Sequence, residues 1–135
     1  MKKYLFLLFV IGLCAPAFAQ QANQKGPVIT FEKKTFDFGD IKQGDKVEHT
    51  FTFTNTGTEP LIITNVEVTC GCTTPKGFTR DPIAPGGKSE ITVAFNSAGK
   101  LGRQNKVVTV VSNAVNAGGN KISFTANVLA GESVQ

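Results

Sequence analysis

The sequence contains no tryptophan, one histidine (His49) and three cysteines (Cys14, Cys70 and Cys72). An antibody-type domain packs a tryptophan against a disulfide between widely spaced cysteines, so that class of domain is excluded. A structural zinc site takes about four ligands, and a serine hydrolase needs a histidine base beside a nucleophile-elbow serine. The chain offers neither set of residues, and we therefore expect no enzymatic activity and no cofactor.

Arginine is also scarce, with Arg80 and Arg103 as its two copies, and the lysines are scattered along the chain. The formal charge is +4, and two of the positive charges belong to Lys2 and Lys3 at the N-terminus. Nucleic-acid binding needs lysines and arginines clustered into a basic stripe. We therefore expect no nucleic-acid partner.

The longest apolar run lies at the N-terminus. Lys2 and Lys3 precede Tyr4–Leu13 (YLFLLFVIGL), and Ala17–Ala19 then provides a small-x-small cleavage pattern. This order predicts a cleaved secretory signal peptide over residues 1–19, because the apolar run is too short to span a bilayer. We expect an exported protein, in the periplasm or outside the cell, with no membrane span in the mature chain.

Cys14 offers an alternative to this cleavage site. Ile11-Gly12-Leu13-Cys14 resembles a bacterial lipoprotein signal, which would leave the protein lipid-anchored through Cys14. Such signals favour Gly, Ala or Ser before the cysteine, and Leu13 is none of these. For the rest of the chain we expect a flexible leader (20–26), one folded domain (27–130) and a C-terminal tail (131–135).

From residue 27 onward, apolar residues alternate with polar ones, as in strands with one buried face. We expect strands at Val28–Phe31, Thr35–Phe38, Lys46–Asn55, Leu61–Thr69, Lys88–Asn96, Gln104–Ser112 and Lys121–Leu129. The segment Gly71–Gly87 is rich in proline and glycine, so it has room for one short edge strand. About seven short strands indicate an all-β, antiparallel sandwich of immunoglobulin type.

The alternation also predicts which side chains face the core. In Lys46–Asn55 the inward face holds His49, Phe51 and Phe53. In Leu61–Thr69 we expect Ile62, Thr64, Val66 and Val68 to point inward. The four valines of Gln104–Ser112 predict a strand that is buried on both sides.

Several short motifs occur together in this sequence: FDFG at Phe36–Gly39, FTFTNTG at Phe51–Gly57, CGCT at Cys70–Thr73, and IAPGG at Ile83–Gly87. In this combination the chain resembles a bacterial family of exported proteins, domain of unknown function 1573, from Phe36 to about Ala114. Its wider relatives are similar to the major sperm protein and to ciliary Hydin-type domains. The resemblance implies a sandwich fold and a binding role, with no assigned reaction.

Cys70, Gly71, Cys72 and Thr73 form the candidate functional turn. Residues i and i+2 of a strand lie about 6–7 Å apart at Cα, the upper end of the range for a disulfide, although Gly71 can shorten the gap with a positive φ. A local disulfide between Cys70 and Cys72, two packed thiols, a thiol-redox pair, a soft-metal site of copper type, and pairing with another chain all stay open. Strand counting offsets His49 from Cys70 by roughly 13 Å, so a joint site is not expected.

These observations lead to two hypotheses. The first is an exported, non-enzymatic structural or protein-interaction module of the cell envelope. It would bind another envelope protein by edge-strand pairing, at Val28–Phe31 or at the stretch after Cys72. The alternative is a thiol-redox or soft-metal handling protein that acts through Cys70, Gly71 and Cys72.

Overall fold

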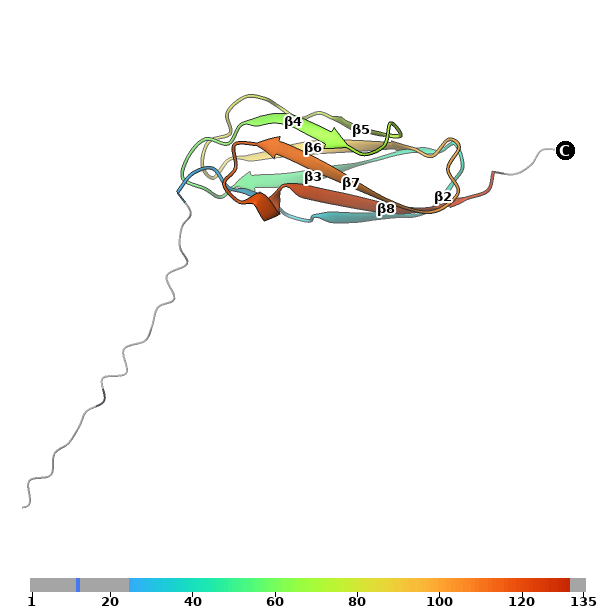
Figure 1. Ribbon diagram of the computed structural model, residues 1–135, viewed down its shortest axis with the longest axis horizontal. Helices are drawn as coiled ribbons and strands as arrows, with labels where there is room; N and C mark the ends of the chain where they lie inside the picture. The colour runs from blue at the N-terminus through green and yellow to red at the C-terminus, as the bar shows by residue number, and fades with distance from the viewer. Residues whose placement is uncertain (1–11, 13–24, 132–135) are drawn as a thin grey trace, which may run out of the picture.

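The computed structural model describes residues 12 and 25–131. Apart from Gly12, the predicted signal peptide with its cleavage site and Cys14 lies outside the described residues, as do residues 132–135. In the described part of the chain, no helix is long and apolar enough to cross a membrane. The chain enters the domain at one end and leaves it at the opposite end (Figure 1).

Eight strands build the domain, in agreement with the all-β sandwich predicted from the sequence. The elements are β1 (Ile29–Phe31), β2 (Thr35–Lys42), β3 (Lys46–Asn55), β4 (Ile63–Val68), β5 (Thr73–Lys76), β6 (Lys88–Asn96), β7 (Gly102–Ser112), the 3-10 turn η1 (Ala117–Gly119) and β8 (Lys121–Leu129). The short edge strand expected within Gly71–Gly87 is β5. The ranges Lys46–Asn55, Lys88–Asn96 and Lys121–Leu129 were predicted with the bounds that the structure has.

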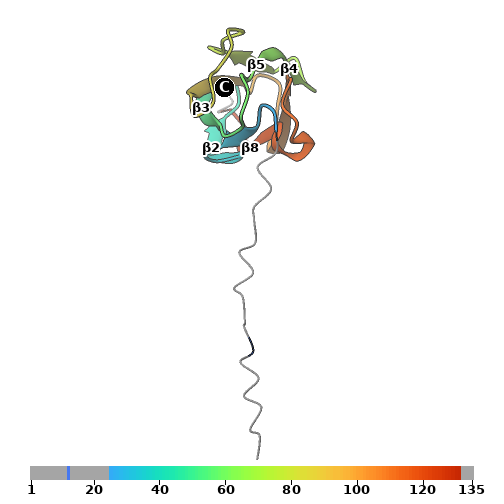
Figure 2. The ribbon, with the colours of Figure 1, turned by 90° about the vertical axis from the view of Figure 1, so that its left-hand side faces the viewer.

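The strands form two four-stranded sheets that pack face to face. Sheet A has the order β1-β3-β6-β5, and sheet B has the order β2-β8-β7-β4. Figure 2 shows the two layers along the sandwich, with β3 and β5 in one and β2, β8 and β4 in the other. Every pair of strands is antiparallel except β2 and β8, which run parallel. The chain crosses from sheet A to sheet B directly after β1.

The core fills the space between the two sheets. It is made of phenylalanine and branched aliphatic side chains, and the largest fully buried ones are Phe51, Phe53, Phe95, Phe124, Ile29, Leu61, Ile63, Ile91 and Ile122. The ring centroids of Phe95 on β6 and Phe124 on β8 lie 5.2 Å apart, so the two sheets contact each other through aromatic rings. Burying one such ring stabilises the fold by about 2–3 kcal/mol.

The predicted orientation of Leu61–Thr69 was wrong for Ile62 and Thr64. Ile62 is 36% exposed and Thr64 is exposed, whereas Leu61 and Ile63 are fully buried. A shift in register between Ile63 and Asn65 adds one residue to β4 relative to β7. Such a bulge reverses the alternation, which is why Val66 is buried as predicted although Ile62 and Thr64 are not.

The prediction that Gln104–Ser112 is buried on both sides was also wrong. Val108 and Val110 face the core, but Val107 on the opposite face is 39% exposed. Sheet B is covered by sheet A on one face only, so the outer side chains of β7 face solvent. Valine is common at such positions because its branched side chain suits the extended backbone.

Candidate functional site

The turn between β4 and β5 brings Cys70 and Cys72 together. Their Cα atoms are 5.1 Å apart, and their sulfur atoms lie at bonding distance. The backbone N–H of Thr73 donates to the carbonyl oxygen of Cys70 at 3.1 Å, so the chain reverses tightly here. Gly71 does not use the positive φ that was open to it; the tight turn alone shortens the distance.

The two sulfur atoms have different surroundings. The N–H of Cys72 donates to Cys70 Sγ at 3.1 Å. Cys72 is half-buried and packs against the core, and its Sγ lies 3.7 Å from the hydroxyl of the buried Thr73. Cys72 also lines a hollow of about 250 Å³ on sheet A, together with Lys46, Gly71, Thr74, Ala94, Phe95 and Asn96.

His49 lies on β3, apart from this turn. Its ring stacks on Phe36 with centroids 3.6 Å apart, and its edge meets Phe51 at 4.8 Å. Burial and the nearby positive charge of Lys33 lower the pKa of His49. Across residues 25–131, no group of three or more His, Cys, Asp or Glu side chains is placed to hold a metal ion. The structure therefore places His49 at the rim of the core.

A second feature is the uncovered flank of β3. β6 accompanies β3 from Lys46 to Thr54, but β1 pairs with it only over Phe53–Asn55. One further bond joins Glu32 N–H to the carbonyl of Thr52 at 3.0 Å, after which the chain leaves for sheet B. Along Lys46–Phe51, β3 has a neighbouring strand on one side only, as far as the described residues show.

The direction of the peptide groups on this flank follows from the bonds at its end. Asn55 exchanges backbone hydrogen bonds with Gly86 and Gly87, so it faces β6. Because successive peptide groups alternate along a strand, Glu48 and Thr50 face the uncovered side. Among the described residues, no backbone or side-chain hydrogen bond reaches the N–H groups of Glu48 and Thr50.

A hollow of about 240 Å³ lies along this flank. It is lined by Glu32, Lys33, His49, Thr50, Phe51 and Thr52. β2 does not fill the position of the missing strand, because it lies in the other sheet and pairs with β8. We use the term β3 flank for Glu48–Thr52 and this hollow.

In each of the two edge segments named from the sequence, some outward backbone groups are already occupied or missing. The side chain of Asn116 accepts from Ile29 N–H at 3.0 Å and donates to Ile29 C=O at 2.8 Å, which occupies both edge groups of that residue. On β5, Cys72 C=O accepts from Asn96 N–H and thus points toward β6. The backbone N–H and C=O groups therefore point away from β6 at Thr73 and Pro75. Thr73 N–H is already bonded to Cys70, and proline has no N–H, so this edge offers no donor within β5.

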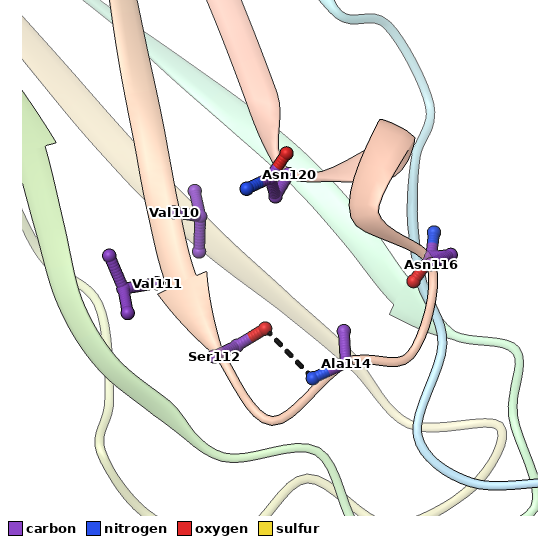
Figure 3. Close-up of a pocket in the computed structure, with 6 residues that line it drawn as sticks. All are labelled: Val110, Val111, Ser112, Ala114, Asn116 and Asn120. Atoms are coloured by element: carbon purple, nitrogen blue, oxygen red, sulfur yellow. Dashed lines mark hydrogen bonds between the residues drawn. The ribbon is translucent and has the colours of Figure 1, made fainter.

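Figure 3 shows a smaller pocket between the end of β7 and the start of β8. It has a volume of about 130 Å³ and is lined by Val110, Val111, Ser112, Ala114, Asn116 and Asn120. Ala114 N–H donates to the hydroxyl of Ser112 at 3.1 Å, and Asn120 Oδ1 is the one buried side-chain oxygen or nitrogen among the described residues without a hydrogen-bond partner. The side chain of Asn116 is already hydrogen-bonded to Ile29. We therefore regard this pocket as part of the structure that caps sheet A and not as a binding site.

Sequence reasoning missed Asn55, which is completely buried. Its side-chain N–H₂ donates to the carbonyls of Glu59 and Ile83 at 2.8 and 2.9 Å, and its oxygen accepts from the N–H groups of Val28 and Gly57 at 3.3 and 3.0 Å. The FTFTNTG motif contained the signal, since a polar residue stands there at a position of inward-facing parity.

Comparison with solved structures finds similar sandwich folds in other proteins. A protein of unknown function from Porphyromonas gingivalis W83 superposes with a TM-score of 0.65 at 19% identity, over 82% of this chain and 51% of that one. The chain thus spans about half the length of that protein. A search of curated proteins found no match.

Two further likenesses support the fold. The ASH/PapD-like domain 7 of human CEP192 matches with a TM-score of 0.59 at 11% identity, over 87% of this chain and 98% of that one. The VesB protease of Vibrio cholerae matches with a TM-score of 0.57 at 18% identity, over 74% of this chain and 31% of that one. At these identities the likeness concerns the sandwich and not the activity.

A family model covers most of the described domain. It is the model described as protein of unknown function (DUF1573), and it matches residues 29–128, from the first residue of β1 to the penultimate residue of β8. The match includes the FTFTNTG segment, the Cys70–Cys72 turn and the β3 flank. It agrees with the resemblance seen in the sequence motifs, and the chain therefore belongs to the family of proteins of unknown function DUF1573.

Proposed function

We propose that this protein is an exported, non-enzymatic module of the cell envelope that binds another protein by accepting one of its strands on the β3 flank. The observation that carries the proposal is the strand position left empty beside Glu48–Phe51. An extended segment presents N–H and C=O groups at the spacing of a β ladder, so it matches the groups that Glu48 and Thr50 turn outward. Addition of a strand to a sheet edge is a common mode of peptide recognition.

The position of β1 defines where the incoming strand would lie. It would continue the line of β1 along β3, beyond the bond between Glu32 and Thr52. Its side chains would alternate between the hollow and solvent. Lys33 lines the hollow and lowers the pKa of His49 through its positive charge. A strand that places an acidic side chain in the hollow, near Lys33, is therefore favoured.

Export supports a partner in the envelope. The predicted signal peptide over residues 1–19 would direct the chain out of the cytoplasm, into the periplasm or the medium. The chain has one histidine, His49, and its ring is packed against Phe36 and Phe51, so we favour a binding role over catalysis.

Three baits test the proposal in pull-downs from envelope extract. Thr50→Pro removes the N–H that faces the flank, and the bonds between β3 and β6 stay because Thr50 faces away from β6. Thr50→Ala removes the side chain and keeps the N–H. We expect wild type and Thr50→Ala to capture the same partner and Thr50→Pro to lose it. Equal recovery by all three baits would show that the partner binds elsewhere.

A second measurement covers the case in which proline at position 50 prevents folding. A photo-crosslinking phenylalanine analogue at Lys33, on the rim of the hollow, should form an adduct with the captured partner. The same analogue at Lys88, which lies at the end of β6 and forms an ion pair with Glu32 at 3.8 Å, serves as the nearby control. Crosslinking from position 88 but not from position 33 would count against the β3 flank.

The proposal includes a disulfide between Cys70 and Cys72. An exported protein meets an oxidising compartment, and the turn holds the two sulfur atoms at bonding distance. The closed loop is so short that the bond constrains the unfolded chain little. Intact mass of the purified protein, with alkylation before and after reduction, tests this point: two thiols that react without reductant would refute it.

A further inference from the structure

We propose that the Cys70–Cys72 disulfide exchanges with an anionic thiol, and that the thiol attacks Cys72 from the hollow beside it. This inference rests on the disulfide of the proposed function and is independent of strand binding at the β3 flank. It assigns a ligand class to the hollow of about 250 Å³ on sheet A, which the strand-binding proposal does not use.

The shape of the hollow determines which sulfur atom is attacked. Cys72 lines it and Cys70 does not. Ala94 forms part of its floor, because a methyl group there leaves room between Glu48 on β3 and Thr74 on β5, the two residues that flank it in the register. A small thiol that enters this space approaches Cys72.

The exchange step is balanced without any further oxidant or reductant. The incoming thiolate forms a bond to Cys72 Sγ, the bond between Cys72 Sγ and Cys70 Sγ breaks, and Cys70 Sγ leaves with the electron pair as a thiolate. The N–H of Cys72, which already donates to Cys70 Sγ at 3.1 Å, stabilises the negative charge that develops there. The better leaving group is therefore Cys70.

The charge around the hollow selects the class of thiol. Lys46 lines it and forms no ion pair in the part of the chain that the structure describes, whereas Lys76 on the neighbouring strand pairs with Glu48 at 2.6 Å. The hollow thus contains one uncompensated positive charge, which attracts a thiol that carries a carboxylate. A unit charge about 6 Å away in water changes the local concentration of an anion about threefold.

Two small thiols of opposite charge test this selection. The oxidised wild-type protein and Lys46→Gln are each treated with 3-mercaptopropionate and with cysteamine, and the reaction is quenched with acid and followed by intact mass. For each thiol, the rate with wild type is compared with the rate with Lys46→Gln. The intrinsic reactivity of the thiol cancels in this ratio. We expect Lys46→Gln to slow the reaction with 3-mercaptopropionate about threefold and not to slow that with cysteamine.

Lys88→Gln is the matched control, because Lys88 lies on the same sheet at the far end of β6 and should change neither rate. Salt at about 1 M should abolish the effect of Lys46. Equal slowing of both thiols by Lys46→Gln, or no slowing of either, would overturn the proposal. Failure of the disulfide to form in wild type would also overturn it, and would leave strand binding at the β3 flank intact.

Single-cysteine variants test which sulfur atom is attacked. Cys70→Ser and Cys72→Ser are each mixed with the symmetrical disulfide of 3-mercaptopropionate, after thermal unfolding has shown that both are folded. Lys46→Gln is then added to each variant. We expect it to slow the reaction of the Cys72 thiol (in Cys70→Ser) more than the reaction of the Cys70 thiol (in Cys72→Ser). The reverse order would contradict attack from the hollow.

Discussion

The side chain of Asn116 occupies both backbone groups of Ile29, with hydrogen bonds of 3.0 and 2.8 Å. An asparagine amide carries one donor and one acceptor side by side, as a strand does, so a single side chain occupies both edge groups of Ile29. Exposed edges invite pairing with other chains. The cap therefore closes one end of this edge and leaves the β3 flank as its uncovered part.

Removal of this cap should destabilise the domain. We expect Asn116→Ala to lower the free energy of unfolding by about 1–3 kcal/mol, because two partly buried backbone groups lose their partner. Asn113 makes similar but exposed bonds to Ile62 N–H and Pro60 C=O, and Asn113→Ala should cost less. Chemical denaturation of both variants measures the difference, and an equal cost would show that burial of the Ile29 cap is unimportant.

Asn55 should tolerate substitution worse than Asn116. Its side chain is fully buried and makes four hydrogen bonds. We expect Asn55→Ala to lower the free energy of unfolding by about 3 kcal/mol or more. Two backbone N–H groups and two backbone carbonyls would each lose their hydrogen bond to this buried side chain. Thermal unfolding should show a larger drop than for Thr54→Ala, whose side chain is on the outer face of the same strand. A drop no larger than that of the control would contradict the assigned role.

Gly57 in the same motif is required for close approach of two backbone segments. A Cβ at this position would overlap the carbonyl oxygen of Gly26 and lie 2.5 Å from the nitrogen of Val28. We expect Gly57→Ala to destabilise the protein by about 1–3 kcal/mol. Gly71→Ala is the control, because a Cβ there meets nothing within 4 Å. Denaturation midpoints that fall equally for the two variants would refute the steric explanation.

The uncovered state of the β3 flank predicts a pattern of amide hydrogen exchange. The N–H groups of Glu48 and Thr50 face away from β6, and those of His49 and Phe51 bond to it. In the free protein we expect the first two to exchange at least about tenfold faster than the second two. Exchange followed residue by residue by NMR measures this. Similar protection of all four amides would show that the flank is already covered.

His49 should make stability depend on pH. Burial and the charge of Lys33 lower its pKa below the ordinary value of 6.5, so the unfolded chain takes up the proton first as the pH falls. Stability should be complete above pH 6.5 and decline below it. We expect the melting temperature to drop between pH 7.5 and 5.5 in wild type and to drop less in His49→Gln. The lowered pKa of Asp37 acts only below its ordinary value of 3.8, outside this range.

The sequence alone determined the fold class and most of the strands. Period-two alternation is a local property, so Lys46–Asn55, Lys88–Asn96 and Lys121–Leu129 were located without knowledge of their neighbours. The same reasoning failed at Ile62 and Thr64, because a bulge in β4 is created by its pairing with β7 and leaves no local signal. It failed at Gln104–Ser112 because composition does not reveal whether a sheet is covered on one face or on two.

The candidate sites divide in the same way. The Cys70–Cys72 turn is contiguous, so its sequence sufficed to identify it and to predict that the two sulfur atoms can approach each other. The β3 flank could not be predicted, because the strand Lys46–Asn55 looks complete and only the pairing shows that β1 covers a small part of it. The cap on Ile29 depends on a residue brought there by the fold, because Asn116 lies 87 positions away in the sequence, whereas the missing donors of β5 are a local property of its turn and its proline. Local patterns specify strands and turns, whereas the edge that stays open is decided by which strands meet, a property of the tertiary structure.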